Sequence, residues 1–117
     1  MINLDYTNRT PIYEQIVNEI EKYVALGILK EQEQIMSIRE LASTLGINPN
    51  TVKKAYSILE SRNIITSMST KGTFIKLNAS KVKEETINNY LNDINNIIDK
   101  LSKLGLPKKE ILERLNK

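Results

Sequence analysis

Apolar residues recur at steps of three and four through the first half of the chain, and this spacing predicts three helices. The first begins at Thr10-Pro11, with Thr as the cap and Pro at the first helical position, and it ends near Gly27. The second begins at Ser37-Ile38-Arg39-Glu40, which has the spacing of a capping box, and ends at Gly46. The third begins at Asn48-Pro49 by the same combination of cap and proline.

The pattern changes after residue 63, where runs rich in β-branched residues occupy 64–68 and 73–77. They flank turn-forming residues at 69–72, so this region predicts a two-stranded hairpin. Residues 30–36 are predicted to form a loop with a very short strand. Two helices joined by a turn that contains Gly46 form a helix-turn-helix, and a hairpin directly after them describes a winged helix.

Another apolar pattern occupies the last third of the chain. Ser80 is a suitable cap for a long helix that runs to about residue 104 with three apolar residues per heptad. Gly105-Leu106-Pro107 interrupts this helix, and a short last helix is predicted from about residue 108. The predicted fold is mainly α with a small β-wing: a winged helix-turn-helix at 1–77, then a C-terminal two-helix hairpin at 78–117.

The composition limits the chemistry that the chain can perform. Having no Cys and no His, it lacks disulfides, cysteine nucleophiles, Ser-His-Asp triads and imidazole metal ligands. Some carboxylates of the long predicted helix could suggest a metal site, but we interpret them as a solvated flank beside lysines: Glu84, Glu85, Asp93 and Asp99. We therefore expect no enzymatic activity, no metal site and no cofactor.

Neither a basic and apolar leader nor an apolar run of the roughly 18 residues that cross a bilayer is present. We expect a soluble cytoplasmic protein. The formal net charge of +3 hides an uneven distribution. Residues 1–36 contain three basic and six acidic side chains, a net −3, whereas residues 37–76 contain six basic and two acidic ones, a net +4. The middle of the chain is the part that an anionic partner prefers.

The third predicted helix carries side chains suited to reading DNA. Its outward residues offer hydroxyl, amide and ammonium donors: Asn50, Thr51, Lys53 and Lys54. Such a helix fits the major groove, meets base edges with its N-terminal residues, and favours phosphate at its N-terminus. Tyr56 is expected in the core with its hydroxyl within reach of phosphate. At the hairpin tip, Lys71 adds charge and Gly72 permits close approach to the neighbouring backbone or minor groove.

These motifs together resemble the DNA-binding head of the GntR family of bacterial transcription regulators. The matching stretches cover about two thirds of the chain: Pro11-Ile12-Tyr13-Glu14-Gln15-Ile16, Ser37-Ile38-Arg39-Glu40-Leu41-Ala42, Asn50-Thr51-Val52, Ala55-Tyr56, Leu59-Glu60 and Lys71-Gly72-Thr73-Phe74-Ile75. Each stretch alone is weak, but their joint order is specific. The resemblance implies a winged-helix head that binds double-stranded operator DNA.

The resemblance also implies individual roles. Arg39 matches the arginine that family members place against a guanine edge, and Lys53 matches a basic residue that contacts bases. Thr51 and Ser37 match hydroxyls that contact phosphate. The wing tip is matched by Lys71 and Gly72, with Thr73 beside them. The alternatives are an ion pair of Arg39 with Glu40 or Glu14, and simple solvation of Lys53 and Lys54.

The chain departs from the family pattern at four positions. Met36 replaces the usual Pro before Ser37, and Glu33 is taken as the replacement of a Gly that commonly precedes the short strand. Asn63 replaces a Gly after the third helix and suits a left-handed backbone. Thr70 replaces the first Gly of the wing, which weakens the expectation that the wing enters the minor groove deeply.

The tail resembles that of the short, YtrA-like subfamily, whose helical pair is used for dimerisation. Only 40 residues follow residue 77, too few to enclose a cavity of the roughly 300 Å³ expected of ligand sites. We therefore expect no pocket, so that an effector, whose identity is unknown, would act at the dimer interface or between head and tail. The short last helix cannot cover the apolar stripe, so a second copy is expected to cover these residues: Ile87, Tyr90, Leu91, Ile94, Ile97, Ile98, Leu101, Leu104, Ile111, Leu112 and Leu115.

The leading prediction is a sequence-specific DNA-binding transcriptional regulator that represses as a homodimer on a near-palindromic operator. The helix at about 49–62 enters the major groove and the hairpin at 64–77 is the wing. The alternative, from another class, is a winged-helix module for protein–protein interaction without specific DNA binding.

Overall fold

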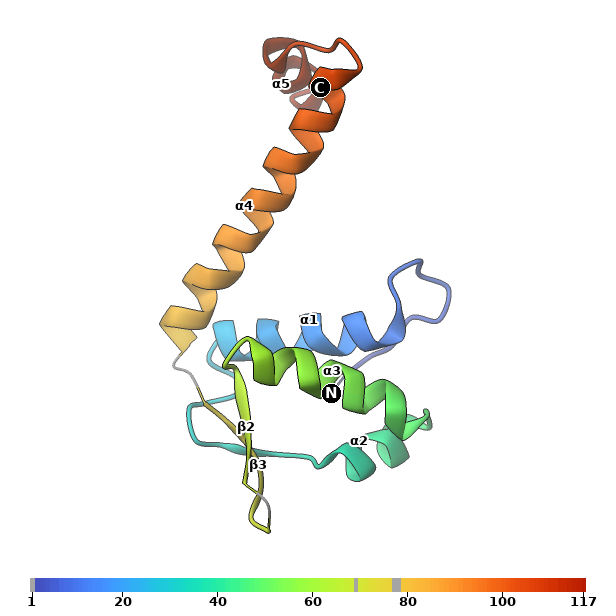
Figure 1. The fold of residues 1–117 in the computed structure, drawn as a ribbon, viewed down its shortest axis with the longest axis vertical. Helices are drawn as coiled ribbons and strands as arrows, with labels where there is room; N and C mark the ends of the chain where they lie inside the picture. Colours follow the sequence, from blue (N-terminus) through green and yellow to red (C-terminus); the bar gives the residue numbers. More distant parts are fainter. Residues whose placement is uncertain (1, 69, 77–78) are drawn as a thin grey trace. The chain divides into compact units, whose positions relative to one another are not determined.

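A computed structural model describes residues 2–68, 70–76 and 79–117 of the chain. The described part forms the predicted elements in the predicted order (Figure 1): α1 (Ile12–Ala25), β1 (Gln34–Ile35), α2 (Ile38–Leu45), α3 (Pro49–Ser61), β2 (Ile65–Met68), β3 (Gly72–Ile75), α4 (Ala79–Lys103) and α5 (Lys108–Leu115). It is a winged helix-turn-helix followed by two helices. The chain divides into two compact units, residues 1–83 and 84–117, which we call the head and the tail.

The core of the head lies where α3 packs against both α1 and α2. Apolar side chains at helical spacing on α1 and α3 are almost completely buried there: Ile16, Val17, Ile20, Val24, Val52, Ala55 and Leu59. Ile65 and Ile75 extend this cluster onto the sheet. Each large apolar side chain contributes roughly 1.5–3 kcal/mol when it is fully buried, so this cluster holds the helices in place.

The helix ends of the turn agree with the sequence prediction. Asn48 caps α3, since its side-chain oxygen accepts from the backbone N–H of Asn50 at 2.8 Å. Gly46 ends α2 with a left-handed φ of 68°. At α1 the prediction was one residue early, because Pro11 occupies the cap position, Ile12 is the first helical residue and no side chain caps the helix.

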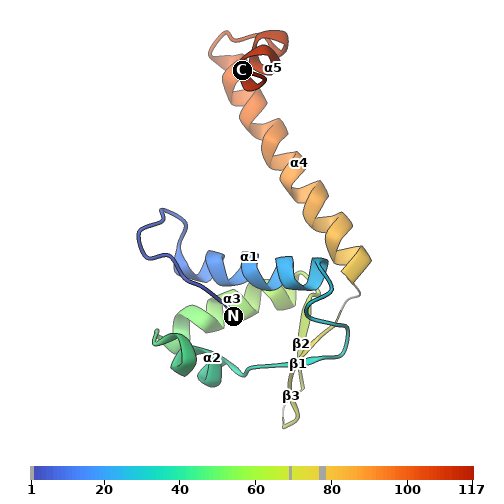
Figure 2. The same ribbon diagram turned by 180° about the vertical axis from the view of Figure 1, so that it is seen from behind.

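The sheet differs from the predicted two-stranded hairpin, because β1 joins it and gives the order β1-β3-β2. All pairs are antiparallel, with Gln34 opposite Phe74 and Ser67 opposite Thr73. The strands β2 and β3 form a hairpin that projects from the helices of the head (Figures 1 and 2). The strand bounds are narrower than predicted, and residue 77 lies outside the described residues.

Two residues other than glycine adopt positive φ angles beside the sheet, Gln32 at 68° and Asn63 at 59°. The left-handed conformation of Asn63 confirms that asparagine replaces a glycine there. The other glycine-like position is Gln32 rather than Glu33, so that assignment was wrong by one residue.

The unit boundary lies inside α4, six residues beyond the expected boundary after residue 77. Val82 accounts for this shift, because it is only 1% exposed and belongs to the core cluster of the head. Ser80 was predicted as the cap of the long helix, but α4 already begins at Ala79, so Ser80 falls within its first turn. The predicted joint at Asn78 lies outside the described residues. No helix in the described part of the chain is long and apolar enough to cross a membrane.

Candidate nucleic-acid interface

The N-terminus of α2 is held by the predicted capping box. The Ser37 hydroxyl oxygen accepts from the backbone N–H of Glu40 at 3.2 Å, and the Glu40 carboxylate accepts from the Ser37 N–H at 3.2 Å. Because the hydroxyl oxygen acts as an acceptor, its own hydrogen can still be donated to a phosphate. Together with the free amides of the first turn, this makes the helix end suited to an anion.

Arg39 lies in the first turn of α2, and its side chain is exposed. Within residues 2–68, 70–76 and 79–117, neither an ion pair nor a hydrogen bond of its guanidinium is found. The alternative pairing with Glu40 or Glu14 is therefore not formed. A guanidinium that is exposed and unpaired on a fixed helix end can present two N–H donors to a pair of acceptors.

The residues predicted to line the outer face of α3 behave in two ways. Asn50 and Lys53 are exposed and Thr51 is half-buried, so their polar groups remain accessible. Lys54 instead places its ammonium 4.0 Å from the ring centroid of Tyr13 in α1, a cation–π contact. Its charge stays at the surface, but its direction is set by this ring.

Tyr56 is buried, with 5% of its surface exposed, and its hydroxyl donates to the backbone oxygen of Met36 at 2.6 Å. Burial raises the pKa of Tyr56, and the negative charge of Glu40 adds to the effect. The side chain therefore ties α3 to the residue that precedes Ser37. This contact favours a packing role, and Tyr56 is not part of the surface that we assign to DNA.

The wing presents Lys71 at its turn, and this side chain is exposed. Thr73 differs from the expectation, because it is only 7% exposed in the middle strand, paired with Ile35 on one side and Ser67 on the other. Gly72 has a φ of 115°, and a Cβ there would lie 2.5 Å from the side-chain nitrogen of Gln34. The close approach that Gly72 permits is therefore to Gln34 within the chain.

Sequence reasoning missed two contacts that support this surface. Arg62, at the end of α3, forms an ion pair with Glu21 of α1, whose side chain is 6% exposed. Glu21 lies among buried α1 residues at positions 16, 17, 20 and 24, so a carboxylate on this apolar face was the available signal. The other contact, from Gln34 to the wing, is not indicated by the order of apolar and polar residues in the sequence.

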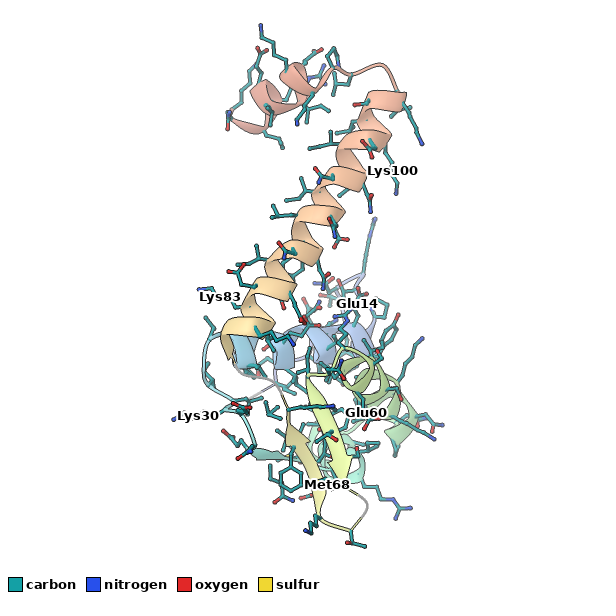
Figure 3. All side chains as sticks on the ribbon, turned by 60° about the vertical axis from the view of Figure 1, so that its left-hand side comes forward. Glu14, Lys30, Glu60, Met68, Lys83 and Lys100 are labelled. Carbon is teal, nitrogen blue, oxygen red and sulfur yellow. The ribbon has the colours of Figure 1, made fainter. Side chains whose placement is uncertain are left out.

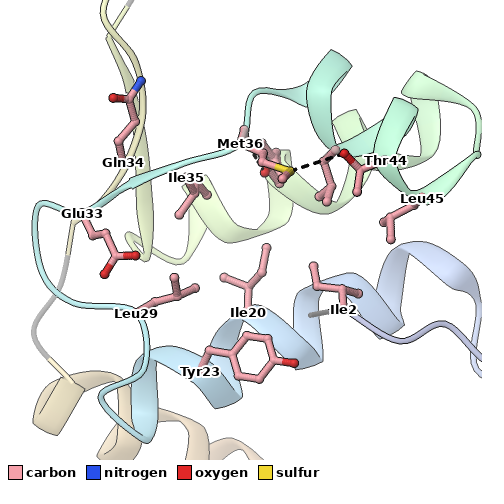
Figure 4. A pocket seen from close by; sticks show the side chains of 12 residues that line it. Ile2, Ile20, Tyr23, Leu29, Glu33, Gln34, Ile35, Met36, Thr44 and Leu45 are labelled. Carbon is pink, nitrogen blue, oxygen red and sulfur yellow. Dashed lines mark hydrogen bonds between the residues drawn. The ribbon is translucent and has the colours of Figure 1, made fainter.

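A cavity of about 450 Å³ lies in the head (Figure 4). Its walls come from the N-terminal segment, α1, the loop after it, β1, α2 and α3, and are mostly apolar: Ile2, Ile20, Tyr23, Leu29, Ile35, Met36, Leu41, Leu45 and Tyr56, with Glu33, Gln34 and Thr44 as the polar members. The expectation that the chain has no pocket is wrong for the head, since the cavity forms between segments far apart in the sequence.

The tail has an uncovered apolar stripe. Figure 3 shows side chains projecting along α4 between the labelled Lys83 and Lys100. Eight of the predicted interface residues are exposed by 40% or more: Ile87, Tyr90, Leu91, Ile94, Ile97, Leu104, Leu112 and Leu115. Ile98 and Leu101 are half-buried. Ile111 is only 3% exposed and lies outside the core cluster of the head, so it packs within the tail. Among the described residues, no group of three or more acidic side chains is arranged to hold a metal ion.

Comparison with known proteins bears on this arrangement of helices and wing. The sequence model described as "Bacterial regulatory proteins, gntR family" matches residues 12–75, from α1 to the end of β3. The chain belongs to the GntR family. The match confirms that the capping-box, α3 and wing motifs resemble this family, whose description is that of bacterial regulatory proteins.

Two relatives of the GntR head are named YtrA. The chain is 44% identical over 79 residues to the "HTH-type transcriptional repressor YtrA" of Bacillus subtilis (strain 168), a match that covers 68% of this chain and 61% of that relative. The solved structure of "YtrA from Sulfolobus acidocaldarius, a GntR-family transcription factor" is 33% identical with a TM-score of 0.62, and covers 98% of this chain and 93% of that one. The structural match to the Sulfolobus protein therefore covers nearly the full chain, whereas the chain spans about three fifths of the length of the Bacillus relative.

A further structural relative of the GntR head is bound to DNA. The structure "AraR(DBD) in complex with operator ORR3" matches 62% of this chain and 88% of that one, with 27% identity and a TM-score of 0.54. The head therefore has the fold of a domain that has been solved on an operator.

Proposed function

We propose that this protein is a homodimeric, sequence-specific repressor of transcription that acts in the cytoplasm and binds a near-palindromic operator. The observation that carries the proposal is that Arg39, on the capped N-terminus of α2, is exposed and has no partner among the described residues, in the same helix-turn-helix as the accessible start of α3. Operator binding by AraR and repression by YtrA, as their names state, support it.

In this proposal each predicted DNA-contacting residue that remains accessible has one task. Arg39 and Lys53 contact base edges in the major groove, where a guanidinium or ammonium pairs with guanine acceptors. Ser37, Thr51 and Lys54 contact phosphate, and Asn50 offers its amide at the start of α3. Lys71 contacts the backbone beside the wing. Tyr56 and Thr73 support the surface from inside the head without touching DNA.

The apolar stripe of the tail supports the dimer. Each of its large side chains would contribute about 1.5 kcal/mol or more if a second copy covered it completely. Three apolar positions per heptad suit a bundle of helices from two chains better than a narrow two-stranded seam. A two-fold dimer presents two copies of α3, so half-sites would lie about 34 Å apart or at a multiple of that spacing.

The salt dependence of binding tests the proposal. A labelled mixed-sequence duplex of about 30 base pairs should bind at low salt, and log affinity should fall steeply and linearly as log salt rises, since phosphate contacts release counterions. Fluorescence anisotropy over a series of KCl concentrations measures the slope. Absence of binding at the lowest salt would remove this proposal and favour a winged-helix module that binds protein.

A further inference from the structure

Gln34 reaches from β1 across the sheet to the turn of the wing. It stands opposite Phe74 on β3, so Gly72, two residues earlier, is its diagonal neighbour on the same face. Its side-chain Nε2 donates to the backbone oxygen of Lys71 at 3.2 Å. Figure 4 shows this side chain lying against the hairpin, apart from the side chains of Leu29 and Ile20 that line the cavity.

Gly72 makes room for this contact. Any larger residue would place a Cβ 2.5 Å from the Gln34 nitrogen, too close for an ordinary contact, and its φ of 115° is one that residues with side chains rarely adopt. The hydrogen bond from Gln34 to Lys71 and the room left by Gly72 therefore belong to one contact between β1 and the wing. Neither is needed for the ladder pairs of β1 with β3, which are backbone contacts.

Two other hydrogen bonds among the described residues also bear on the hairpin near this turn. Lys71 N–H donates to the Met68 oxygen at 2.7 Å, which closes the turn. On the other strand, the Glu60 carboxylate of α3 accepts from the Ser67 N–H at 3.2 Å and holds β2 to the helix. Among the described residues, Gln34 is the side chain seen to hydrogen-bond to the backbone of Lys71 itself.

From this geometry we infer that Gln34 is a positioning residue for DNA binding: it orients the wing turn so that Lys71 faces the nucleic-acid backbone. The inference rests on the proposed function and deepens it. Gln34 precedes Ser37 by only three residues, and Met36 between them receives the Tyr56 hydroxyl. The same short segment therefore leads into the capped end of α2 and also supports the wing. It connects the helix end that carries Arg39 to the turn that carries Lys71.

A double-mutant cycle tests whether Gln34 acts through Lys71. Gln34→Ala, Lys71→Ala and the double variant are compared with the wild type on the same labelled mixed-sequence duplex of about 30 base pairs across a KCl series. Lys71→Ala should lower the salt slope by about one. Gln34→Ala should weaken binding about three- to tenfold, the effect of one lost hydrogen bond, and lower the slope partially. The double variant should bind no more weakly than Lys71→Ala.

Two further variants separate positioning from general support of the fold. Gln34→Met keeps the approximate size and the neutral charge of the side chain but removes the donor, so it should behave like Gln34→Ala. Gln32→Gly removes a glutamine side chain two residues away, at a left-handed position that glycine accepts, so it should leave DNA affinity unchanged. Thermal unfolding followed by circular dichroism checks that every variant is folded under the binding conditions.

The outcomes distinguish the two proposals. If the wild type does not bind the duplex, the proposed function fails. If the wild type binds, three results overturn the role of Gln34: unchanged affinity of Gln34→Ala, a full further loss when Gln34→Ala is added to Lys71→Ala, or no effect of Lys71→Ala. A loss that occurs in Gln34→Ala and disappears in the Lys71→Ala background supports it.

Discussion

At the scale of single residues, Arg39 combines an exposed guanidinium with a backbone that a capping box holds in place. The capping box on either side of it, from Ser37 to Glu40, sets the backbone of the first turn of α2. The guanidinium itself is exposed and unpaired within the described chain. When such an arginine binds DNA, it does not have to break an ion pair or a hydrogen bond within the described chain.

We predict that Arg39→Ala weakens binding to the selected operator by about 1–3 kcal/mol and weakens binding to random DNA much less. The reason is that a bidentate contact to a base is lost only where the correct base is present. Anisotropy titrations on both duplexes measure the ratio. Arg114→Ala removes the same charge from the tail and should leave this ratio unchanged. An equal loss on both duplexes for Arg39→Ala would show that Arg39 does not read sequence.

Single residues were predictable where the contact is local. The capping box was read from four consecutive residues, and the structure forms it. The partners of Lys54 and Tyr56 are distant, since Tyr13 lies in another helix and Met36 lies 20 residues earlier. A position on a helical wheel identifies neither partner, so the sequence pattern did not predict these two contacts.

At the scale of elements, the sheet also contains a contact between segments that are distant in the sequence. β1 has only two residues, and its local sequence does not indicate a pairing partner; it pairs with β3, where Thr73 and Phe74 lie 38 and 40 positions after their partners Ile35 and Gln34. Helices were predictable because their apolar period and caps are written within each segment. The very short strand expected within 30–36 is also confirmed, but its pairing with the hairpin was not predicted, because only closure of the head brings Gln34 beside Phe74.

The contact between α3 and the segment before α2 leads to a prediction about pH. Tyr56→Phe deletes the hydrogen bond to Met36 and should lower the free energy of unfolding at neutral pH by about 1 kcal/mol. The pKa of Tyr56 is raised in the folded protein above its ordinary value of 10.0, mainly by burial. Above pH 10 the unfolded chain therefore loses this proton while the folded chain keeps it, so the wild type loses stability as pH rises.

The advantage of the wild type over Tyr56→Phe should consequently shrink above about pH 10, by up to about 1.4 kcal/mol per pH unit. Urea denaturation from neutral pH to about pH 11 measures it. Tyr6→Phe, which changes a tyrosine that is 67% exposed, is the matched control and should follow the wild type. A stability difference for Tyr56→Phe that stays constant across this range would mean that Tyr56 is not held in its neutral form by burial.

At the scale of the whole molecule, the two units have opposite surfaces. The head gathers its buried apolar side chains in one core cluster although it leaves some apolar side chains such as Leu26 exposed, whereas the tail leaves eight large apolar side chains exposed by 40% or more. This apolar stripe is the feature on which the proposed dimer rests, because large exposed apolar patches mark interaction sites. The period of the stripe was readable from the sequence, but the burial of Ile111 within the tail was not, since it depends on how α5 packs.

The last prediction concerns the role of the tail. The full chain should sediment as a dimer, and truncation after Lys83 should give a folded monomer, because it keeps Val82 in the core of the head and removes the apolar stripe. Truncation after Leu77 is less suitable, since it deletes Val82.

In the full chain, Ile94→Asp places a carboxylate on the stripe and should also give a monomer, whereas Asn96→Asp adds the same charge off the stripe and should remain dimeric. Sedimentation velocity distinguishes these species. A truncated head that stays dimeric, or an Ile94→Asp variant that does, would move the dimer contact out of the tail. The opposite result ties the spacing of the two α3 helices, and thereby the spacing of the half-sites, to the tail.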